Sequence, residues 1–297
     1  MDLQKCNICP RNCNVDRNIK RGFCRMSNNI KVAKAYLHKW EEPCISGERG
    51  SGTVFFTGCN LKCVFCQNYK ISQENFGITV SIEKLADIFL NLEKLGAHNI
   101  NLVSPTIYIP KIKESILIAK DKGLSIPIVY NSNAYENVEL LRILDGLIDI
   151  YLPDLKYYDD TTAIKFSYAP EYFKYAKKAI LEMFRQVGVP IFDKNGIMKR
   201  GLIIRHLILP GKLHETKKIL KWIKENLPKE VYVSLMGQYI PYYKAKNYPE
   251  INKKIDNRDY EEAINYFFEI GLENGFVQDD ESASENYIPN FNLEGIN

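Results

Sequence analysis

Three cysteines in one short segment, "GCNLKCVFCQN", carry the most specific chemical signal in the sequence. Cys59, Cys63 and Cys66 follow the spacing C-x3-C-x2-C, and residues 67–297 contain no cysteine. A structural zinc site requires four ligands in a closed tetrahedron, usually delivered as two C-x2-C pairs. A [4Fe–4S] cluster held by three thiolates instead leaves one iron without a protein ligand. The spacing favours such a cluster over a zinc site with a borrowed fourth ligand or three packed structural cysteines.

An iron with an open position offers a defined chemistry. It can chelate the amino and carboxylate groups of a ligand such as the methionine part of S-adenosylmethionine. Reduction of the cluster beside the sulfonium then breaks a carbon–sulfur bond and releases a 5′-deoxyadenosyl radical, which abstracts hydrogen from a substrate. The cofactor carries out this reaction, and the protein has to position it and exclude water.

A second set of cysteines lies near the N-terminus with the spacing C-x2-C-x3-C-x10-C, formed by Cys6, Cys9, Cys13 and Cys24. Four thiolates at this spacing suit zinc, a single iron or a fully ligated [4Fe–4S] cluster equally well. Unliganded or disulfide-linked cysteines are the alternative, which a reducing compartment disfavours. The eighth cysteine, Cys44, is either a small buried hydrophobic residue or a nearby ligand or reactive thiol.

The composition excludes several classes of protein. With 297 residues, of which 45% are hydrophobic and 26% charged, the chain can bury a full core. The 40 basic and 36 acidic residues are mixed along the chain and give a net charge of +4, so a nucleic-acid partner is not expected. No apolar run approaches the ~20 residues of a membrane span, and the first residues lack the apolar part of a secretory signal. We therefore expect a soluble, cytoplasmic protein without a membrane partner.

The chain alternates between short apolar runs and amphipathic segments. The runs predict strands at residues 53–57, 99–104, 126–131, 148–155, 201–209 and 231–237. The amphipathic segments between and after them predict helices at residues 81–96, 110–123, 136–146, 170–187, 215–227 and 259–271. Six strand–helix units in series favour parallel strands joined by right-handed crossovers.

This alternation fits an open doubly wound sheet or a partial or complete barrel, and periodicity does not choose between them. In both folds the chemistry belongs at the carboxyl ends of the strands. The cysteine loop directly follows the first predicted strand, so it lies at that end. We divide the chain into a cysteine-rich head at residues 1–50, an α/β domain at residues 51–275 and a polar, loosely held extension at residues 276–297.

The segment "TGCNLKCVFCQN", with an aromatic residue before its third cysteine, resembles the radical S-adenosylmethionine (radical SAM) superfamily. More segments resemble the branch related to pyruvate formate-lyase activating enzyme: "CNICPRNCNVDR", "HKWEEPCISGERGSGTVFFTG", "PIVYNSNAYE", "DIYLPDLKYY", "RGLIIRHLILPG" and "VSLMGQYIP". The resemblance implies a partial (β/α)6 barrel, a [4Fe–4S] cluster on Cys59, Cys63 and Cys66, and S-adenosylmethionine. It further implies an electron donor such as flavodoxin or ferredoxin and leaves room for a protein substrate.

The resemblance also points to residues near the bound cofactor. Asp154 and Lys156, in "DIYLPDLKYY", match the activase strand that ends in Asp-Leu-Lys, with Asp154 a possible ligand of a monovalent cation. Arg205, in "IIRHLILPG", is a candidate to hold the carboxylate or ribose, and His206 faces the other side of its strand. The alternatives are a helix-capping role for Asp154 and an interior ion pair for Arg205.

Two departures from the activase pattern fall at strand ends. Residues 104–106 read Ser-Pro-Thr where activases carry Gly-Gly-Glu, and residues 131–134 read Asn-Ser-Asn-Ala in place of Asp-Thr-Asn-Gly. Ser104, Asn131 and Ser132 are therefore the candidates to contact the cofactor there. Their side chains replace hydrogen bonds but not the lost negative charges, which puts cation binding and the substrate class in doubt.

Three functions follow from this reading. The first is the activation of a glycyl-radical enzyme by hydrogen abstraction from a backbone glycine. The second is a radical SAM enzyme that modifies a peptide or a small metabolite. The third, from another class, is a non-catalytic metal-binding adaptor that uses both sets of cysteines. The sequence assigns no residue that itself takes part in hydrogen transfer.

Overall fold

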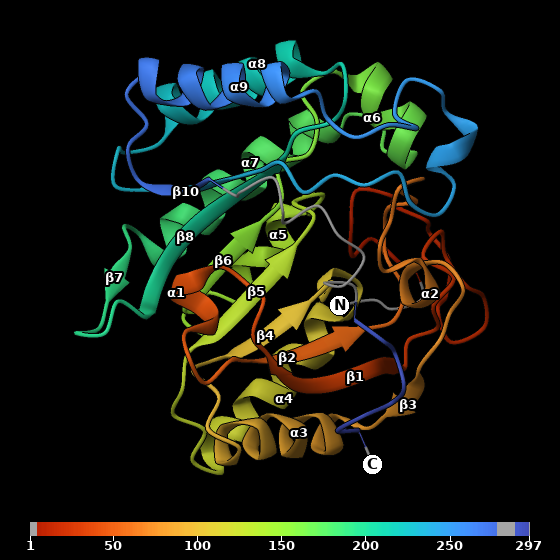
Figure 1. Ribbon diagram of the computed structural model, residues 1–297. Coiled ribbons are helices and arrows are strands. Elements are labelled where there is room, and N and C mark those ends of the chain that lie inside the picture. The colour runs from red at the N-terminus through yellow and green to blue at the C-terminus, as the bar shows by residue number, and fades with distance from the viewer. Residues whose placement is uncertain (1–4, 278–288, 297) are drawn as a thin grey trace.

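The computed structural model describes residues 5–277 and 289–296, and its centre is a sheet in the strand order β10-β9-β8-β6-β5-β4-β2-β1-β3 (Figure 1). All six predicted strands are present and pair in parallel. They are β2 (Ser51–Phe56), β4 (Ile100–Val103), β5 (Ile128–Ser132), β6 (Ile150–Pro153), β8 (Met198–Leu207) and β9 (Tyr232–Met236). A further parallel strand, β10 (Gly275–Val277), follows β9. Among the described residues, the two ends of this path do not pair, so the sheet does not close into a complete barrel, in agreement with the predicted partial barrel.

Helices cover the outer face of the sheet, close to the positions predicted from periodicity (Figure 1). The longer ones are α3 (Ile82–Lys94), α4 (Ile109–Asp121), α7 (Tyr172–Val187), α8 (Leu213–Asn226) and α9 (Asn257–Glu269). Between them lie the shorter α5 (Val138–Arg142), α6 (Asp160–Ser167), η1 (Thr106–Tyr108) and η2 (Ala245–Asn247). In α3, the side chain of Ser81 caps the first turn, and the apolar stripe is buried against the sheet. Within the described residues, no helix has both the length and the apolar character of a membrane span.

Part of the predicted head belongs to the sheet. Strand β1 (Ile30–His38) pairs antiparallel with β2 on one side and with β3 (Ile78–Val80) on the other. Neither strand is predicted from the sequence, because lysines interrupt the apolar alternation of β1. The small β7 (Ile191–Phe192), also missed, pairs with β8. The four head cysteines precede β1, so this strand ties the cysteine-rich segment to the barrel.

The predicted extension at residues 276–297 is described only in part, because residues 278–288 and 297 lie outside the described residues. Residues 289–296 run beside β1. The backbone N–H of Leu293 donates to Ala33, and that of Ala35 donates to Glu294. Phe291 packs on Phe55 of β2 with its ring centroid 5.5 Å away. This part of the extension therefore packs against the sheet and is not loosely held.

The inside of the barrel is divided into two layers. At the amino ends of the strands lies an apolar cluster formed by Cys44, Ile45, Val129, Ile150, Leu152, Met198 and Ile203. Cys44 and Ile45 belong to α1 (Pro43–Ser46), which fills this end of the barrel. Cys44 is thus a buried small residue of the core. Toward the carboxyl ends of the same strands, the inward-facing positions hold polar residues. Polar groups that could take part in a reaction therefore gather at this end of the barrel.

Candidate active site

The loop that carries the three central cysteines, residues 58–68, is fixed by buried anchors and backbone hydrogen bonds. Leu61, Val64 and Phe65 are buried in the main core. The N–H of Val64 donates to Phe166 (2.8 Å) at the end of α6, and its carbonyl accepts from Lys244 (2.8 Å). The loop begins at Gly58, where φ is +90° and a Cβ would lie 2.3 Å from Met26 Cγ. Glycine is required there because the head packs directly on this turn.

Each thiol in this loop has a hydrogen-bonding neighbour. Asn133 Nδ2 donates to Cys59 Sγ (3.3 Å), and Ser167 Oγ donates to Cys63 Sγ (2.9 Å). The Ser72 hydroxyl of α2 (Tyr69–Ser72) lies 3.3 Å from Cys66 Sγ. Hydrogen bonds to sulfur are one of the means by which proteins tune iron–sulfur clusters.

Burial keeps these cysteines protonated when no metal is bound. It raises the pKa of Cys59 to about 12 and that of Cys66 to about 11. For Cys63, burial also raises the pKa, and nearby Lys156 acts in the opposite direction. A thiolate is the form that binds iron, so loading a cluster here releases protons.

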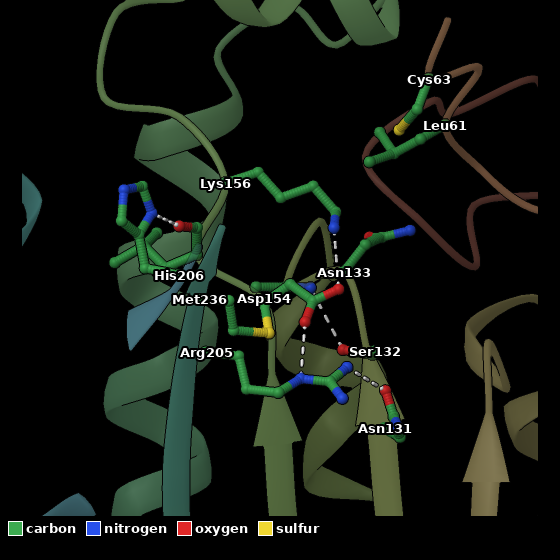
Figure 2. A network of polar contacts seen from close by, with 12 residues as sticks. Leu61, Cys63, Asn131, Ser132, Asn133, Asp154, Lys156, Arg205, His206 and Met236 are labelled. Carbon is green, nitrogen blue, oxygen red and sulfur yellow. Dashed lines mark hydrogen bonds and ion pairs between the residues drawn. The ribbon is translucent and has the colours of Figure 1, made fainter. Parts of the chain in front are cut away.

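The Asp154 carboxylate is paired with two cations at the carboxyl ends of β6 and β8 (Figure 2). Lys156 Nζ lies 2.8 Å from its Oδ2, and Arg205 Nε lies 2.8 Å from its Oδ1. Burial acts to raise the pKa of Asp154, but Arg205 and Lys156 together lower it. The two side chains place two positive charges on the Asp154 carboxylate, and these contacts are ion pairs and not the predicted helix cap.

Arg205 also contacts a carboxylate that the sequence analysis missed. Its Nη1 donates to Glu41 Oε1 at 2.7 Å, and its Nη2 donates to Asn131 Oδ1 at 2.7 Å. The other oxygen of Glu41 accepts from Asn131 Nδ2 (2.9 Å) and Asn101 Nδ2 (3.0 Å). Glu41 lies between β1 and α1 and reaches into the barrel. It places a negative charge in the region where both acidic residues of the activase pattern are missing.

His206, next to Arg205 on β8, points to the opposite face of the strand (Figure 2). Its ring nitrogens lie 2.7 Å from the carbonyl oxygen of Leu155 and 2.9 Å from Thr216 Oγ1 of α8. Burial lowers its pKa to about 4. His206 is therefore a neutral residue that joins β8 to its helix and does not face the site.

All the residues predicted for the cluster and the cofactor line one cavity of about 270 Å³. These are Cys59, Cys63, Cys66, Ser104, Asn131, Ser132, Asp154, Lys156 and Arg205. Ser104 has a left-handed backbone (φ +59°), a conformation uncommon for a non-glycine residue. The cavity is also lined by Glu41, Asn133 and the residues at its mouth. The four head cysteines do not line it.

The mouth of the cavity is rich in aromatic side chains. Trp40 lines it and is 67% exposed. Phe65 and Tyr239, which also line it, pack edge to face with centroids 5.6 Å apart. Beside them, Tyr69 of α2 stacks on Tyr243 at 4.5 Å. Apolar rings around a polar interior suit a site from which water has to be excluded.

A protein-family model described as "Radical SAM superfamily" matches residues 53–223, the region that contains the cysteine loop and strands β4, β5, β6 and β8. The chain belongs to the radical SAM superfamily. The fold and the family predicted from the cysteine spacing are confirmed, and the non-catalytic adaptor is set aside because the family is one of enzymes. A [4Fe–4S] cluster and S-adenosylmethionine are the cofactors that membership in this superfamily implies.

Two proteins of Methanocaldococcus jannaschii are related to this radical SAM chain. "Uncharacterized protein MJ0674" is 35% identical over 271 residues, which cover 88% of this chain and 74% of the relative. "Putative glycyl-radical enzyme activating enzyme MJ1227" is 33% identical over 112 residues, 37% of this chain and 44% of the relative. The second match confirms the resemblance to the activase-related branch over that part of the chain.

A solved structure shares the fold. Streptococcus suis SuiB bound to the precursor peptide SuiA superposes with a TM-score of 0.52 at 17% identity, over 74% of this chain. The chain spans 46% of the length of SuiB. The likeness concerns the arrangement of strands and helices and does not extend to the substrate.

The donor set fits the cofactors of the family. Three free cysteines line one cavity whose other polar groups include two carboxylates, a guanidinium, an ammonium and amide or hydroxyl groups. These groups can pair with both the ammonium and the carboxylate of a bound amino acid. Cys59, Cys63 and Cys66 of this chain match the cysteines that bind the cluster in the radical SAM superfamily. Asp154, Lys156 and Arg205 are proposed to hold S-adenosylmethionine.

Proposed function

We propose that this radical SAM protein abstracts a hydrogen atom from a glycine of a partner protein, in the manner of a glycyl-radical-enzyme activase. The observation that carries the proposal is the convergence of the three loop cysteines and the Asp154–Lys156–Arg205 group on one cavity. The relative named as an activating enzyme supports the choice of a protein substrate.

The residues of the chain have separate tasks in this proposal. Cys59, Cys63 and Cys66 bind the cluster, and Ser167 donates a hydrogen bond to the sulfur of Cys63. Lys156 and Arg205 hold the carboxylate of the methionine part, while Asp154 pairs with its ammonium and keeps both cations in place. When bound, the cluster and S-adenosylmethionine supply a 5′-deoxyadenosyl radical after one electron from a flavodoxin or ferredoxin.

The mouth of the cavity suits a polypeptide segment. The exposed Trp40 offers an apolar face, and Gln67 and Gln238 line the same opening with amide groups that can pair with a peptide backbone. Tyr239 and Phe65 narrow the passage toward the cysteines. A glycine has no side chain, so it is the residue that approaches a confined site most closely.

Isotope transfer tests the proposal directly. The reconstituted chain is mixed anaerobically with S-adenosylmethionine, a one-electron donor and a glycyl-radical protein that carries deuterated glycine. We expect deuterium in the 5′-deoxyadenosine and a glycyl-radical signal in electron paramagnetic resonance. The matched controls are a partner with its radical glycine changed to alanine and the Cys63→Ala variant of this chain.

Two outcomes would contradict the activase proposal. One is 5′-deoxyadenosine formed without deuterium in the presence of the partner. The other is turnover of a peptide or a small metabolite that needs no glycyl-radical protein, which would favour the second function predicted from the sequence.

A further inference from the structure

The four head cysteines form a site of their own, away from the catalytic cavity. Cys6, Cys9 and Cys24 are buried, and Cys13 is partly buried. All eight cysteines of the chain are free, so none of them forms a disulfide in this structure. The segment folds back on itself, because the N–H of Cys6 donates to Val15 and the carbonyl of Cys6 accepts from Asn14.

The four cysteines lie in one folded segment. The backbone N–H of Asn12 donates to the carbonyl of Cys9 at 3.1 Å, and a Cβ on Gly22, two residues before Cys24, would lie 3.1 Å from Cys13 Sγ. The N–H of Phe23 donates to Cys13 Sγ at 3.3 Å. Four free cysteines in one folded, largely buried segment form a candidate ligand set for a metal centre.

Two arginines of this segment, the buried Arg17 and the partly buried Arg11, have unused hydrogen-bond donors. Among the described residues, Nη2 of Arg11 and Nε of Arg17 are buried and have no hydrogen-bond partner. The side chain of Arg17 is 2% exposed, and its other two nitrogens donate to the carbonyls of Ile107 and Ser27, each at 2.6 Å. Arg17 lowers the pKa of Cys24, which burial raises, so its charge acts on the thiols.

Arg11 lies between the head and the catalytic loop. Its guanidinium carbon lies 3.7 Å from the ring centroid of Phe23, the residue before Cys24. Its Nε donates to the carbonyl of Asn60 at 2.8 Å, directly after Cys59. A buried donor that lacks a partner is costly. An anionic metal–thiolate centre in the head would pair with the charge of Arg11 and accept from its unused N–H.

The spacing of the sulfurs distinguishes a cluster from zinc. Zinc with Zn–S bonds of about 2.3 Å draws four tetrahedral sulfurs to about 3.8 Å from one another. No three of the four described head sulfurs lie within 4.8 Å of one another. The same holds for Cys59, Cys63 and Cys66, which match the [4Fe–4S] ligands of the family. A cubane needs the wider spacing because four irons stand between its thiolates.

We propose that Cys6, Cys9, Cys13 and Cys24 hold a second, fully ligated [4Fe–4S] cluster, held against the catalytic loop through Arg11. With four protein ligands, this cluster has no open iron and does not bind S-adenosylmethionine. The proposal goes beyond the proposed function, since it holds for any substrate of the catalytic site.

Metal counting on the anaerobically purified full chain tests this inference. We expect about eight iron and eight sulfide ions per chain, from two clusters of four each, and no stoichiometric zinc. One zinc with about four irons would overturn the proposal, as would four irons with no other metal. This measurement uses the unaltered protein, so no folding defect can explain its result.

A variant of the catalytic set isolates the head. The Cys59→Ser, Cys63→Ser, Cys66→Ser triple variant should keep about half of the iron and sulfide. After reduction, its paramagnetic signal should be unchanged by S-adenosylmethionine. The matching Cys9→Ser, Cys13→Ser variant should keep the signal that S-adenosylmethionine shifts. Loss of all iron from the triple variant, while its circular dichroism remains that of the wild type, would overturn the proposal and leave the proposed function standing.

Discussion

Arg205 Nη1 donates to Glu41 Oε1 at 2.7 Å, joining a strand of the barrel to a residue from the link between β1 and α1. The two side chains are 13% and 10% exposed. Because the same carboxylate accepts from Asn101 and Asn131, it fixes three inward-facing side chains of the sheet. The N-terminal segment is thereby part of the cofactor site.

Replacing Glu41 by glutamine should lower the free energy of unfolding by about 2 kcal/mol, since a buried cation loses a charged partner. The added amide N–H groups also face the donors of Asn101 and Asn131. Anaerobic urea unfolding measures the change. The control is Glu48→Gln, an exposed residue just after α1, which should change stability by less than about 0.5 kcal/mol. Equal stabilities of both variants would contradict the role assigned to Glu41.

Lys156→Gln should weaken S-adenosylmethionine binding about tenfold, because one charge-assisted hydrogen bond is worth roughly 1.5–3 kcal/mol. Asp154 would then be neutralised by Arg205 alone. Anaerobic calorimetry on the reconstituted protein measures the dissociation constant. Lys120→Gln, on the exposed side of α4, provides the control. An unchanged affinity in Lys156→Gln would remove this residue from the proposed cofactor site.

Ser167→Ala should make the reduction potential of the catalytic cluster more negative. Its hydroxyl donates to Cys63 Sγ at 2.9 Å, and such bonds stabilise the more negative, reduced state. A hydrogen bond worth about 1 kcal/mol corresponds to roughly 40 mV for one electron. A potentiometric titration followed by electron paramagnetic resonance measures the shift. Ser115→Ala, a buried serine of α4, should leave the potential unchanged, and equal potentials in both variants would refute the effect.

His206 should make the folded state less stable in acid. Burial lowers its folded pKa to about 4, below the ordinary value of about 6.5. Below pH 6.5 the unfolded chain takes up a proton that the folded chain does not. The free energy of unfolding therefore decreases as the pH is lowered from about 6.5 to about 4. Between pH 7 and pH 5 the wild type should lose about 2 kcal/mol more than His206→Gln.

Unfolding curves at several pH values for wild type and variant measure this difference, because the other titrating groups cancel. His214→Gln, at an exposed histidine of α8, should follow the wild type. A wild type and a His206→Gln variant with parallel pH profiles would show that folding does not lower the pKa of the His206 ring.

The sequence predicted the six barrel strands because each is a continuous apolar run buried under helices, a strong local signal. It also predicted that Arg205 and His206 face opposite sides, since alternation along a strand is a local property. The sequence also predicted Cys59, Cys63 and Cys66 as a set of cluster ligands, because their spacing alone indicates this chemistry.

Other features depend on contacts between distant residues and left no local pattern. The pairing of β1 with β2 depends on packing between segments and could not be predicted from the sequence. The lysines of β1 interrupt the apolar alternation that would have marked it as a strand. The role of Glu41 depends on Arg205, 164 residues further along the chain. Only the adjacent acidic pair in "WEEPC" could have drawn attention to Glu41, and a pair of acids is usually a solvated feature.

The position of all eight cysteines before residue 67 has a consequence for synthesis of the protein. At a translation rate of about 5–20 residues per second, the thiols of both sets leave the ribosome roughly 10–30 s before Arg205 does. During that interval neither β8 nor the cavity it completes exists to shield them. The nascent chain therefore needs either a reducing, oxygen-poor surrounding or early delivery of its iron, before the barrel closes around it.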